Sequence, residues 1–427
     1  MHIRSTKTHS LQGVITPPAS KSEAIRALIF ALLSSGTSSI HQMLDADDIT
    51  EVIHACQTMG AIIQRSGSTL TLTSSGAPFT PGQSRLTTGN SGLTTRLILP
   101  LLGLRTNASN PMVLDCGMQM RARPMAALIS ALNQLGMQIS STEWPLTVTG
   151  TLTGGSATLS EPISQFFSAL LMALPLAPKS STITVGKIPA WSYVEMTFAW
   201  LNRLGIDYKH YQENNLNTII IPGNQQYKPF EYTLSGDFSS ASYFIAAATV
   251  LPGTVRIKGL DKNDTQGDKQ LIPIIQQMGG DISYDGSDII IVGGKPLKGI
   301  RIDASNIPDL LPTLAVLGTV ASGKTEIINV AQARLKETDR IHSMTDGLTH
   351  MGARIDEKND GMTIYPSALI GTTVKGYGDH RTVMSLALAG LLAEGTTVID
   401  EAESIGKTFP QFTSEMKSLG ANMELTP

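Results

Sequence analysis

The chain has 427 residues, of which 41% are hydrophobic and 16% are charged, a length and composition that predict a globular protein of two or three domains. Its 32 Lys and Arg against 35 Asp and Glu give a formal charge of −3, which argues against general binding to nucleic acid or to a membrane surface. The apolar runs are too short to span a bilayer, and the first residues lack the apolar core of a secretory signal. Two cysteines are too few for a disulfide framework or a four-ligand zinc site. We therefore expect a cytoplasmic protein.

A short pattern recurs six times along the chain: an amphipathic stretch, then Met or Leu followed by Gly, then a run of alternating residues. The six glycines, spaced 68 to 76 residues apart, are Gly60, Gly136, Gly205, Gly279, Gly352 and Gly420. Glycine tolerates the left-handed conformation that ends a helix, and alternating runs broken by Gly, Asp or Asn are typical of hairpins. Each copy therefore predicts a helix, a strand, a turn and a second strand.

A unit of about 70 residues buries little apolar surface alone. Three units packed together, with helices inside and sheets outside, bury enough for one domain, so six units predict two similar lobes. We expect the boundary near Ser235-Gly236-Asp237, where a strand-like run gives way to a helix start. A cleft between two such lobes is the default place for a ligand.

The segment from Gly318 to Thr325 matches the phosphate-loop pattern GxxxxGK[ST]. That motif needs a strand before it and a helix after it. Here PDLLPTLAVLG predicts a helix before the match, and TEIINV predicts a strand after it. We therefore expect a plain turn from a helix to a strand, with no bound nucleotide.

Lys and Arg gather in six segments rich in Gly, Ser and Pro, far apart in the sequence: ITPPASKSEAIRAL, TGNSGLTTRL, MRARPM, ARLKETDRI, YGDHRTVM and GKTFPQF. Any one of them could be a solvated helix face. In a chain with few charges, the six together indicate one polyanion site built from both lobes. Asp309, Glu337 and His380 stand among them. A carboxylate surrounded by cations has a low pKa and is an available acceptor or base, although Asp309 could also be a first-turn helix acid.

Together these segments resemble the 5-enolpyruvylshikimate-3-phosphate synthase family over the whole chain, in order. The matching motifs are Lys21-Ser22 with Arg26, Gly89-Asn90-Ser91-Gly92, Arg121-Ala-Arg123-Pro124, Ser164-Gln165-Phe166, Lys336-Glu337 with Arg340, Asp379-His380-Arg381 and Lys407-Thr-Phe-Pro410. The resemblance implies an α/β fold of two lobes around a central cleft, each an inverse α/β barrel of three βαβαββ-type repeats. It also implies that the N-terminal lobe spans residues 20–234 and that residues 1–19 join residues 235–427 in the C-terminal lobe.

The resemblance further implies an enolpyruvyl transferase that moves the enolpyruvyl group of phosphoenolpyruvate to a hydroxyl of shikimate 3-phosphate. The implied donor-binding residues are Lys21, Asn90, Gly92, Arg123, Gln165, Arg340, Arg381 and Lys407. The implied acceptor-binding residues are Ser22, Arg26, Ser164, Gln165, Tyr193, Asp309, Gln332 and Lys336. The implied catalytic residues are Asp309 as base, Glu337 as proton donor, Lys21 and His380, with Lys21 and Lys336 as alternatives for proton handling. No metal or cofactor is expected, the partners are small-molecule substrates only, and the family suggests a monomer.

The sequence departs from the family where the acceptor's 3-phosphate should bind. Ile163 and Ala190 stand where the family has serines, Leu93 stands where many members have Thr, and Cys116-Gly117 replaces a Gly and an acid. Losing two hydroxyl donors weakens a phosphate site by about 1.5–3 kcal/mol each, unless Ser160, Ser192 or a backbone amide compensates. Two alternatives follow: a sibling transferase whose acceptor lacks the 3-phosphate, and a non-catalytic anion-binding protein.

Overall fold

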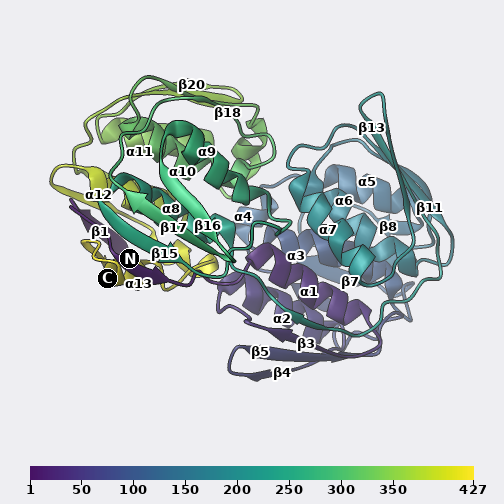
Figure 1. The fold of residues 1–427 in the computed structure, drawn as a ribbon. Coiled ribbons are helices and arrows are strands. Elements are labelled where there is room, and N and C mark those ends of the chain that lie inside the picture. The colour runs from purple at the N-terminus through teal and green to yellow at the C-terminus, as the bar shows by residue number, and fades with distance from the viewer. The chain divides into compact units, whose positions relative to one another are not determined.

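The computed structural model describes all residues from 1 to 427 and divides into two compact units (Figure 1). The inserted unit is Lys21–Leu234, and the terminal unit combines Met1–Ser20 with Ser235–Pro427. Each unit is described by itself below. No helix in the chain combines the length and the hydropathy that a membrane crossing requires.

The inserted unit contains seven α-helices, two short 3₁₀ helices and twelve strands. In chain order they are α1 (Lys21–Leu33), β3 (Gly36–His41), α2 (Asp47–Thr58), β4 (Ile62–Ser66), β5 (Thr69–Ser74), β6 (Arg85–Thr87), α3 (Gly92–Ile98), η1 (Leu99–Leu104), β7 (Met112–Asp115), α4 (Met118–Arg121), α5 (Ala126–Gln134), β8 (Met137–Ile139), β9 (Leu146–Gly150), β10 (Gly155–Leu159), α6 (Ser164–Ala173), η2 (Leu174–Leu176), β11 (Ser181–Val185), α7 (Ser192–Arg203), β12 (Lys209–Glu213), β13 (Leu216–Ile221) and β14 (Glu231–Thr233).

The terminal unit repeats the same alternation of helix and strand. In chain order its elements are β1 (His2–Thr6), β2 (Gly13–Ile15), α8 (Phe238–Val250), β15 (Gly253–Ile257), η3 (Gly267–Gln270), α9 (Leu271–Met278), β16 (Asp281–Asp285), β17 (Asp288–Gly293), β18 (Arg301–Asp303), η4 (Pro308–Leu310), α10 (Leu311–Val320), β19 (Thr325–Ile328), η5 (Ala331–Leu335), α11 (Arg340–His350), β20 (Arg354–Lys358), β21 (Gly361–Tyr365), β22 (Thr373–Val374), α12 (His380–Leu392), β23 (Thr396–Ile399), η6 (Ala402–Lys407), α13 (Phe412–Ser418) and β24 (Met423–Thr426).

Six four-stranded sheets share one pattern, three in each unit. In the sheet β6-β7-β9-β8 the first two strands are parallel and the others antiparallel, and the orders β14-β3-β5-β4, β10-β11-β13-β12, β2-β15-β17-β16, β18-β19-β21-β20 and β22-β23-β1-β24 follow the same plan. The N-terminal strands complete two sheets of the terminal unit, since β2 pairs with β15 and β1 lies between β23 and β24. The fold class expected from the sequence is thereby confirmed.

The six repeat glycines all lie directly at the ends of helices and have positive φ angles between 69° and 103°. A side chain at such an angle is strained, which is why the sequence keeps glycine there. The predicted turn after Gly318 is also confirmed, because α10 precedes the segment and β19 follows it. This order rules out a phosphate loop at that place.

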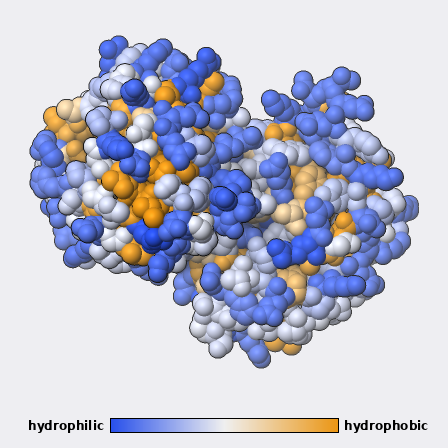
Figure 2. All heavy atoms as spheres, viewed as in Figure 1, coloured by the Kyte–Doolittle hydropathy of each residue, from blue (hydrophilic) through white to orange (hydrophobic).

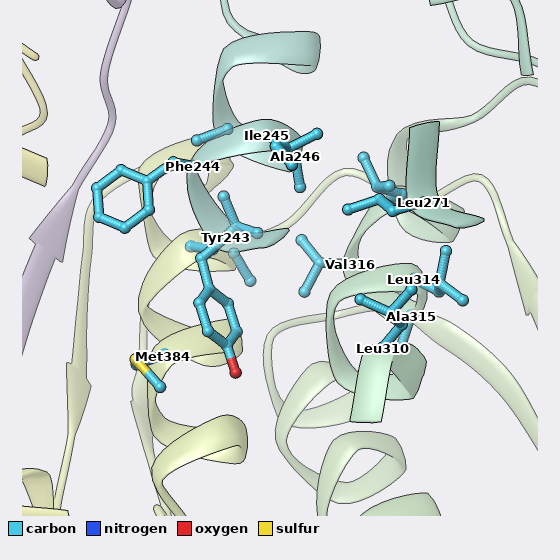
Figure 3. Close-up of a cluster of buried hydrophobic side chains, with 14 of the residues drawn as sticks. Tyr243, Phe244, Ile245, Ala246, Leu271, Leu310, Leu314, Ala315, Val316 and Met384 are labelled. Carbon is cyan, nitrogen blue, oxygen red and sulfur yellow. The ribbon is translucent and has the colours of Figure 1, made fainter. Parts of the chain in front are cut away.

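Each unit has its helices inside and its strands along the outside (Figure 1). The innermost helices, α1, α3 and α6 in the inserted unit and α8, α10 and α12 in the terminal unit, are buried over almost their whole length. Figure 3 shows part of the core where α8, α10 and α12 meet. The visible face of each unit is mostly hydrophilic, with hydrophobic residues in small groups (Figure 2). The first residues of the buried helices carry most of the sequence motifs named above.

Candidate active site

The candidate site residues lie where the buried helices begin. Lys21, Gly92 and Ser164 are the first residues of α1, α3 and α6, and His380 is the first residue of α12. Asp309 lies in η4, the short turn that leads into α10. The first N–H groups of a helix have no partner within the helix and carry partial positive charge, so these positions favour anions.

Asp379 fixes the start of α12 and also holds an arginine from another helix. Its Oδ1 accepts hydrogen bonds from the backbone N–H groups of Arg381 at 2.7 Å and Thr382 at 3.2 Å. Its Oδ2 accepts a hydrogen bond from Nε of Arg340 at 2.9 Å. Asp379 is completely buried. One carboxylate therefore sets the position of both arginines, which come from α11 and α12.

These arginines belong to a cation cluster in the terminal unit, which we define as Lys336, Arg340, Arg381 and Lys407 with the carboxylates of Asp309, Glu337 and Asp379. The carboxylate of Asp309 accepts hydrogen bonds from Nη1 of Arg340 at 2.8 Å and from Nη2 of Arg381 at 3.0 Å, and its Oδ1 forms an ion pair with Nζ of Lys336 at 3.1 Å. Burial raises the pKa of Asp309, but the charges of Arg381, Lys336 and Arg340 outweigh burial and hold that pKa well below its usual value. Asp309 is therefore ionised in the ligand-free protein.

Glu337 completes the cluster. Its carboxylate accepts Nη2 of Arg340 at 2.7 Å and lies 3.7 Å from Nζ of Lys407. Burial lowers the pKa of Arg340, but Asp379, Glu337 and Asp309 raise it above its usual value. The cluster holds four cations and three carboxylates, so it keeps one positive charge in excess. A small polyanion that binds here gains charge-assisted hydrogen bonds from side chains that are already held in place.

His380 and Gln332 lie beside the cluster. His380 is 1% exposed at the start of α12. Gln332 lies in η5, just before Lys336, and its Nε2 donates to the carbonyl of Ser305 at 2.8 Å. Ion pairs thus join six candidate residues of the terminal unit, which are Asp309, Lys336, Glu337, Arg340, Arg381 and Lys407.

In the inserted unit, Lys21 is paired with a carboxylate that the sequence analysis did not single out. Nζ of Lys21 lies 2.9 Å from Oδ2 of Asp48, and the two side chains are only 11% and 6% exposed. Asp48 is in the first turn of α2, where a negative charge is favourable. The pair holds a lysine, at the start of α1, in one position with little exposure to water.

The segment around Asn90 and Gly92 packs directly against the segment that carries Arg123. The Oδ1 of Asn90 accepts the backbone N–H of Gln119 at 3.2 Å. A Cβ atom on Gly92 would lie only 2.2 Å from Nη1 of Arg123. Glycine at this place therefore lets the guanidinium lie against the first turn of α3.

Gln165 is held by an arginine that the sequence analysis left without a role. Nη1 of Arg96 donates to Oε1 of Gln165 at 2.6 Å, and Nη2 of Arg96 donates to the carbonyl of Pro124 at 3.0 Å. Arg96 is 3% exposed, and its guanidinium also lies over the ring of Phe166, 5.2 Å from the ring centroid. Arg96 thereby links the start of α6 to the residue that follows Arg123.

Arg26 lies in the interior of the inserted unit, 1% exposed. Its Nε donates a hydrogen bond to Oγ1 of Thr197 at 2.9 Å, and its Nη1 donates to the carbonyl of Ser22 at 2.9 Å. Its Nη2 donates to the carbonyl of Tyr193 at 3.0 Å and to Oγ of Ser168 at 3.5 Å. Burial lowers the pKa of Arg26 to about 10. Since these bonds use most of the guanidinium N–H groups, Arg26 ties α1, α6 and α7 together in this structure. Its role in acceptor binding stays a prediction.

The two unusual positions near the expected phosphate subsite carry no hydroxyl to donate. Ile163 precedes the first turn of α6 and does not cap it with its side chain. Ala190 is buried and has a positive φ of 55°, which places Trp191 against aromatic neighbours. The Trp191 ring stacks on His210 at 5.3 Å and lies 6.3 Å from Phe167. Ile163 and Trp191 are both partly exposed, and Trp191 packs on rings beside the buried Ala190.

Three further residues support the candidate site, although the sequence analysis gave none of them a role. They are Asp48, Arg96 and Asp379, and each touches a candidate residue through an ion pair or a hydrogen bond. Arg96 and Asp379 do stand inside the motifs TGNSGLTTRL and YGDHRTVM. Both therefore lie in segments that the sequence marks as part of the site, whereas Asp48 lies outside them.

Comparison with known proteins gives one consistent family. The model of the family described as EPSP synthase (3-phosphoshikimate 1-carboxyvinyltransferase) matches residues 5–416. A 3-phosphoshikimate 1-carboxyvinyltransferase from Ruminiclostridium cellulolyticum is 41% identical over 421 residues, 97% of this chain and 98% of that protein. The structure of EPSP synthase from Acinetobacter baumannii is similar over 100% of both chains, with a TM-score of 0.84 and 26% identity.

A second solved structure shares the fold alone. The enolpyruvyl transferase NikO from Streptomyces tendae has a TM-score of 0.79 but only 18% identity, over 100% of this chain and 98% of that chain. The match to the family model and the relative 41% identical, each along nearly the whole chain, decide the assignment. This chain belongs to the EPSP synthase (3-phosphoshikimate 1-carboxyvinyltransferase) family.

Proposed function

We propose that this protein transfers the enolpyruvyl group of phosphoenolpyruvate to a hydroxyl of shikimate 3-phosphate and releases phosphate. One observation carries the proposal: Asp309 is held by three cations within a buried cluster that keeps one positive charge in excess. A donor with a phosphate and a carboxylate on three carbons needs several Arg and Lys donors in fixed positions. The full-length relatives named 3-phosphoshikimate 1-carboxyvinyltransferase support the same substrates.

We assign the donor to cations of both units. In the terminal unit these are Arg340, Arg381 and Lys407, and in the inserted unit Lys21 and Arg123, with Gln165, Asn90 and Gly92 beside them. Preorganised cations stabilise the anionic tetrahedral intermediate more than the reactants, which lowers the barrier. The acceptor is assigned to Ser22, Arg26, Ser164, Gln165, Tyr193, Asp309, Gln332 and Lys336.

The reaction proceeds in two steps. In the addition, the acceptor oxygen bonds to C2 of the donor, the hydroxyl proton passes to Asp309, and C3 takes a proton from Glu337. In the elimination, a proton of C3 returns to Glu337, the double bond re-forms, and the bond from C2 to the phosphate oxygen breaks, so that phosphate leaves with the proton that Asp309 had taken. Lys21 and Lys336 are the alternative carriers of these protons, and we also assign a catalytic role to His380, which stands between Asp379 and Arg381 in the chain.

Donor binding supplies the basicity that Asp309 lacks in the free protein. Arg381, Lys336 and Arg340 hold the pKa of Asp309 down while they are its partners. A bound dianion competes for the same guanidinium groups, which weakens their effect on the carboxylate and raises its pKa. Asp309 therefore becomes an effective base only when the donor is present, so that proton transfer waits for both substrates.

The acceptor assay is the decisive experiment. With phosphoenolpyruvate held constant, phosphate release is measured with shikimate 3-phosphate and with shikimate, and Asp309→Ala serves as the inactive control. We expect shikimate 3-phosphate to be used with kcat/KM of about 10⁴–10⁸ M⁻¹s⁻¹ and shikimate far less well. Turnover of shikimate but not of its 3-phosphate would overturn the proposal and support an acceptor that lacks the phosphate, as Ile163 and Ala190 allow. Binding of phosphoenolpyruvate without turnover of either acceptor would point to an anion-binding protein.

We also propose that the protein works as a monomer in the cytoplasm. Every residue of the candidate site comes from one chain, so no second copy is needed to complete it. Cys56 and Cys116 are both free and buried, which suits a reducing compartment. Light scattering during size-exclusion chromatography measures the mass in solution, and a dimer that dissociates only with loss of activity would contradict the monomer.

A further inference from the structure

Tyr243 is a polar residue within an apolar core. It lies on α8 and is completely buried among the hydrophobic residues of the terminal unit. Its ring packs edge to face on Phe412, with centroids 5.8 Å apart and an angle of 77° between the planes. In Figure 3 the hydroxyl points away from the aliphatic side chains of the cluster. The ring belongs to the core, and the oxygen faces elsewhere.

The hydroxyl of Tyr243 makes no hydrogen bond of normal geometry in the ligand-free protein. A buried hydroxyl without a partner is unfavourable, and a phenylalanine would fill the same space without that cost. Packing of the core alone therefore does not explain why this position holds a tyrosine and not a phenylalanine.

The oxygen faces the cation cluster. Burial raises the pKa of Tyr243 to about 12, and the charges of Arg381 and Arg340 act in the opposite direction, with an opposing contribution from Asp379. The Arg381 guanidinium is near enough for its N–H groups to stabilise the phenolate, although the geometry is not that of a good hydrogen bond. Tyr243 thus offers a neutral acceptor to an arginine that is bonded to Asp309 at 3.0 Å.

We propose that Tyr243 is a positioning residue for Arg381: when the donor binds, the phenol oxygen accepts an N–H of Arg381 and turns the guanidinium from Asp309 toward the donor. A guanidinium has five N–H donors in a planar fork, so one edge can rest on the phenol while another binds an anion. This inference rests on the proposed function, because it needs Arg381 to bind the donor.

The test uses Tyr243→Phe, which keeps the ring and removes only the oxygen. We expect KM for phosphoenolpyruvate to rise about tenfold, which is the size of one hydrogen bond to a charged group, while kcat changes less than about twofold. The unfolding temperature should stay the same or rise, since no hydrogen bond of the free protein is lost.

Tyr227→Phe is the matched control. Tyr227 is equally buried, but its hydroxyl donates to the carbonyl of Met172 at 2.9 Å. This variant should lower the unfolding temperature and leave KM for the donor unchanged, the opposite of the pattern expected for Tyr243→Phe.

A double-mutant cycle with Arg381→Lys isolates the contact. In the Arg381→Lys background, Tyr243→Phe should leave KM for phosphoenolpyruvate unchanged, because a lysine does not present the planar fork. A donor KM within twofold of the wild type for Tyr243→Phe, or an equal rise in both backgrounds, would overturn the inference.

A binding measurement tests the positioning role even if the proposed function is wrong. If the wild type turns over no acceptor, the dissociation constant of phosphoenolpyruvate is measured by calorimetry on the same four variants: wild type, Tyr243→Phe, Arg381→Lys and the double variant. A tenfold weaker affinity for Tyr243→Phe alone supports the positioning role in binding, and an unchanged affinity refutes it.

Discussion

Replacing Gly92 by Ala should damage donor use without damaging the fold. Gly92 is the first residue of α3, and a Cβ there would lie 2.2 Å from Nη1 and 2.9 Å from Cζ of Arg123. Atoms in normal contact are about 3.5 Å apart, so the guanidinium must move by about 1 Å. The far end of an arginine moves easily, and the backbone at Gly92 does not have a positive φ. The free energy of unfolding should therefore change by less than about 1 kcal/mol.

The functional loss should be much larger. A displacement of about 1 Å in a positioned catalytic or binding group can reduce the rate about 10²-fold, which corresponds to about 2.7 kcal/mol of transition-state stabilisation. Steady-state kinetics with varied phosphoenolpyruvate measure kcat/KM, and thermal unfolding measures stability on the same samples. Both quantities are needed, because kcat/KM is expected to fall while stability is expected to stay nearly the same.

Gly82→Ala is the control, since a Cβ at Gly82 meets nothing within 4 Å and its φ is not positive. It should match the wild type in both measurements. In an Arg123→Ala background, the methyl group of Gly92→Ala should cause little further loss, because the next nearest neighbour is the flexible Met120, whose Sδ lies 3.3 Å from the Cβ position. A Gly92→Ala variant with normal kcat/KM for the donor, or one that loses as much activity without Arg123 as with it, would refute the reasoning.

Three further outcomes are expected. Asp309→Ala should lower turnover by about 10²–10⁴-fold, far more than donor affinity, and should cost about 3–5 kcal/mol of unfolding free energy because Lys336, Arg340 and Arg381 each lose one ion pair; kinetics and denaturant unfolding check both. Glu337→Gln should lower turnover in the same range with little change in donor KM, and a rise in KM alone would assign Glu337 to binding. Burial raises the pKa of Asp268 to about 7, against about 3.9 in the unfolded chain, so stability should fall as the pH rises from about 4 to about 7 and should then level off. Asp268→Asn should be the more stable protein at pH 8, with the difference shrinking toward pH 4 in thermal unfolding scans.

The sequence alone determined the parts of this protein that depend on short-range physics. A glycine just after a helix, or an alternating run beside a turn, acts through neighbouring residues, so the six repeats, the hairpins and the helix before β19 could be predicted. The family motifs named the cations of the cluster for a related reason, since each motif is a short segment at the start of a helix.

Only the tertiary structure decided which of these groups meet. Arg381 and Asp309 are separated by 72 residues, Arg340 and Asp379 by 39, and Arg26 and Thr197 by 171. Such pairs depend on how the buried helices pack, and no local pattern encodes a partner at that distance. The same holds for β1, which pairs with β23 and β24 from the far end of the chain. It also holds for Tyr243, whose sequence setting is that of a core residue, because burial and the direction of its hydroxyl arise only when α8 packs against α12.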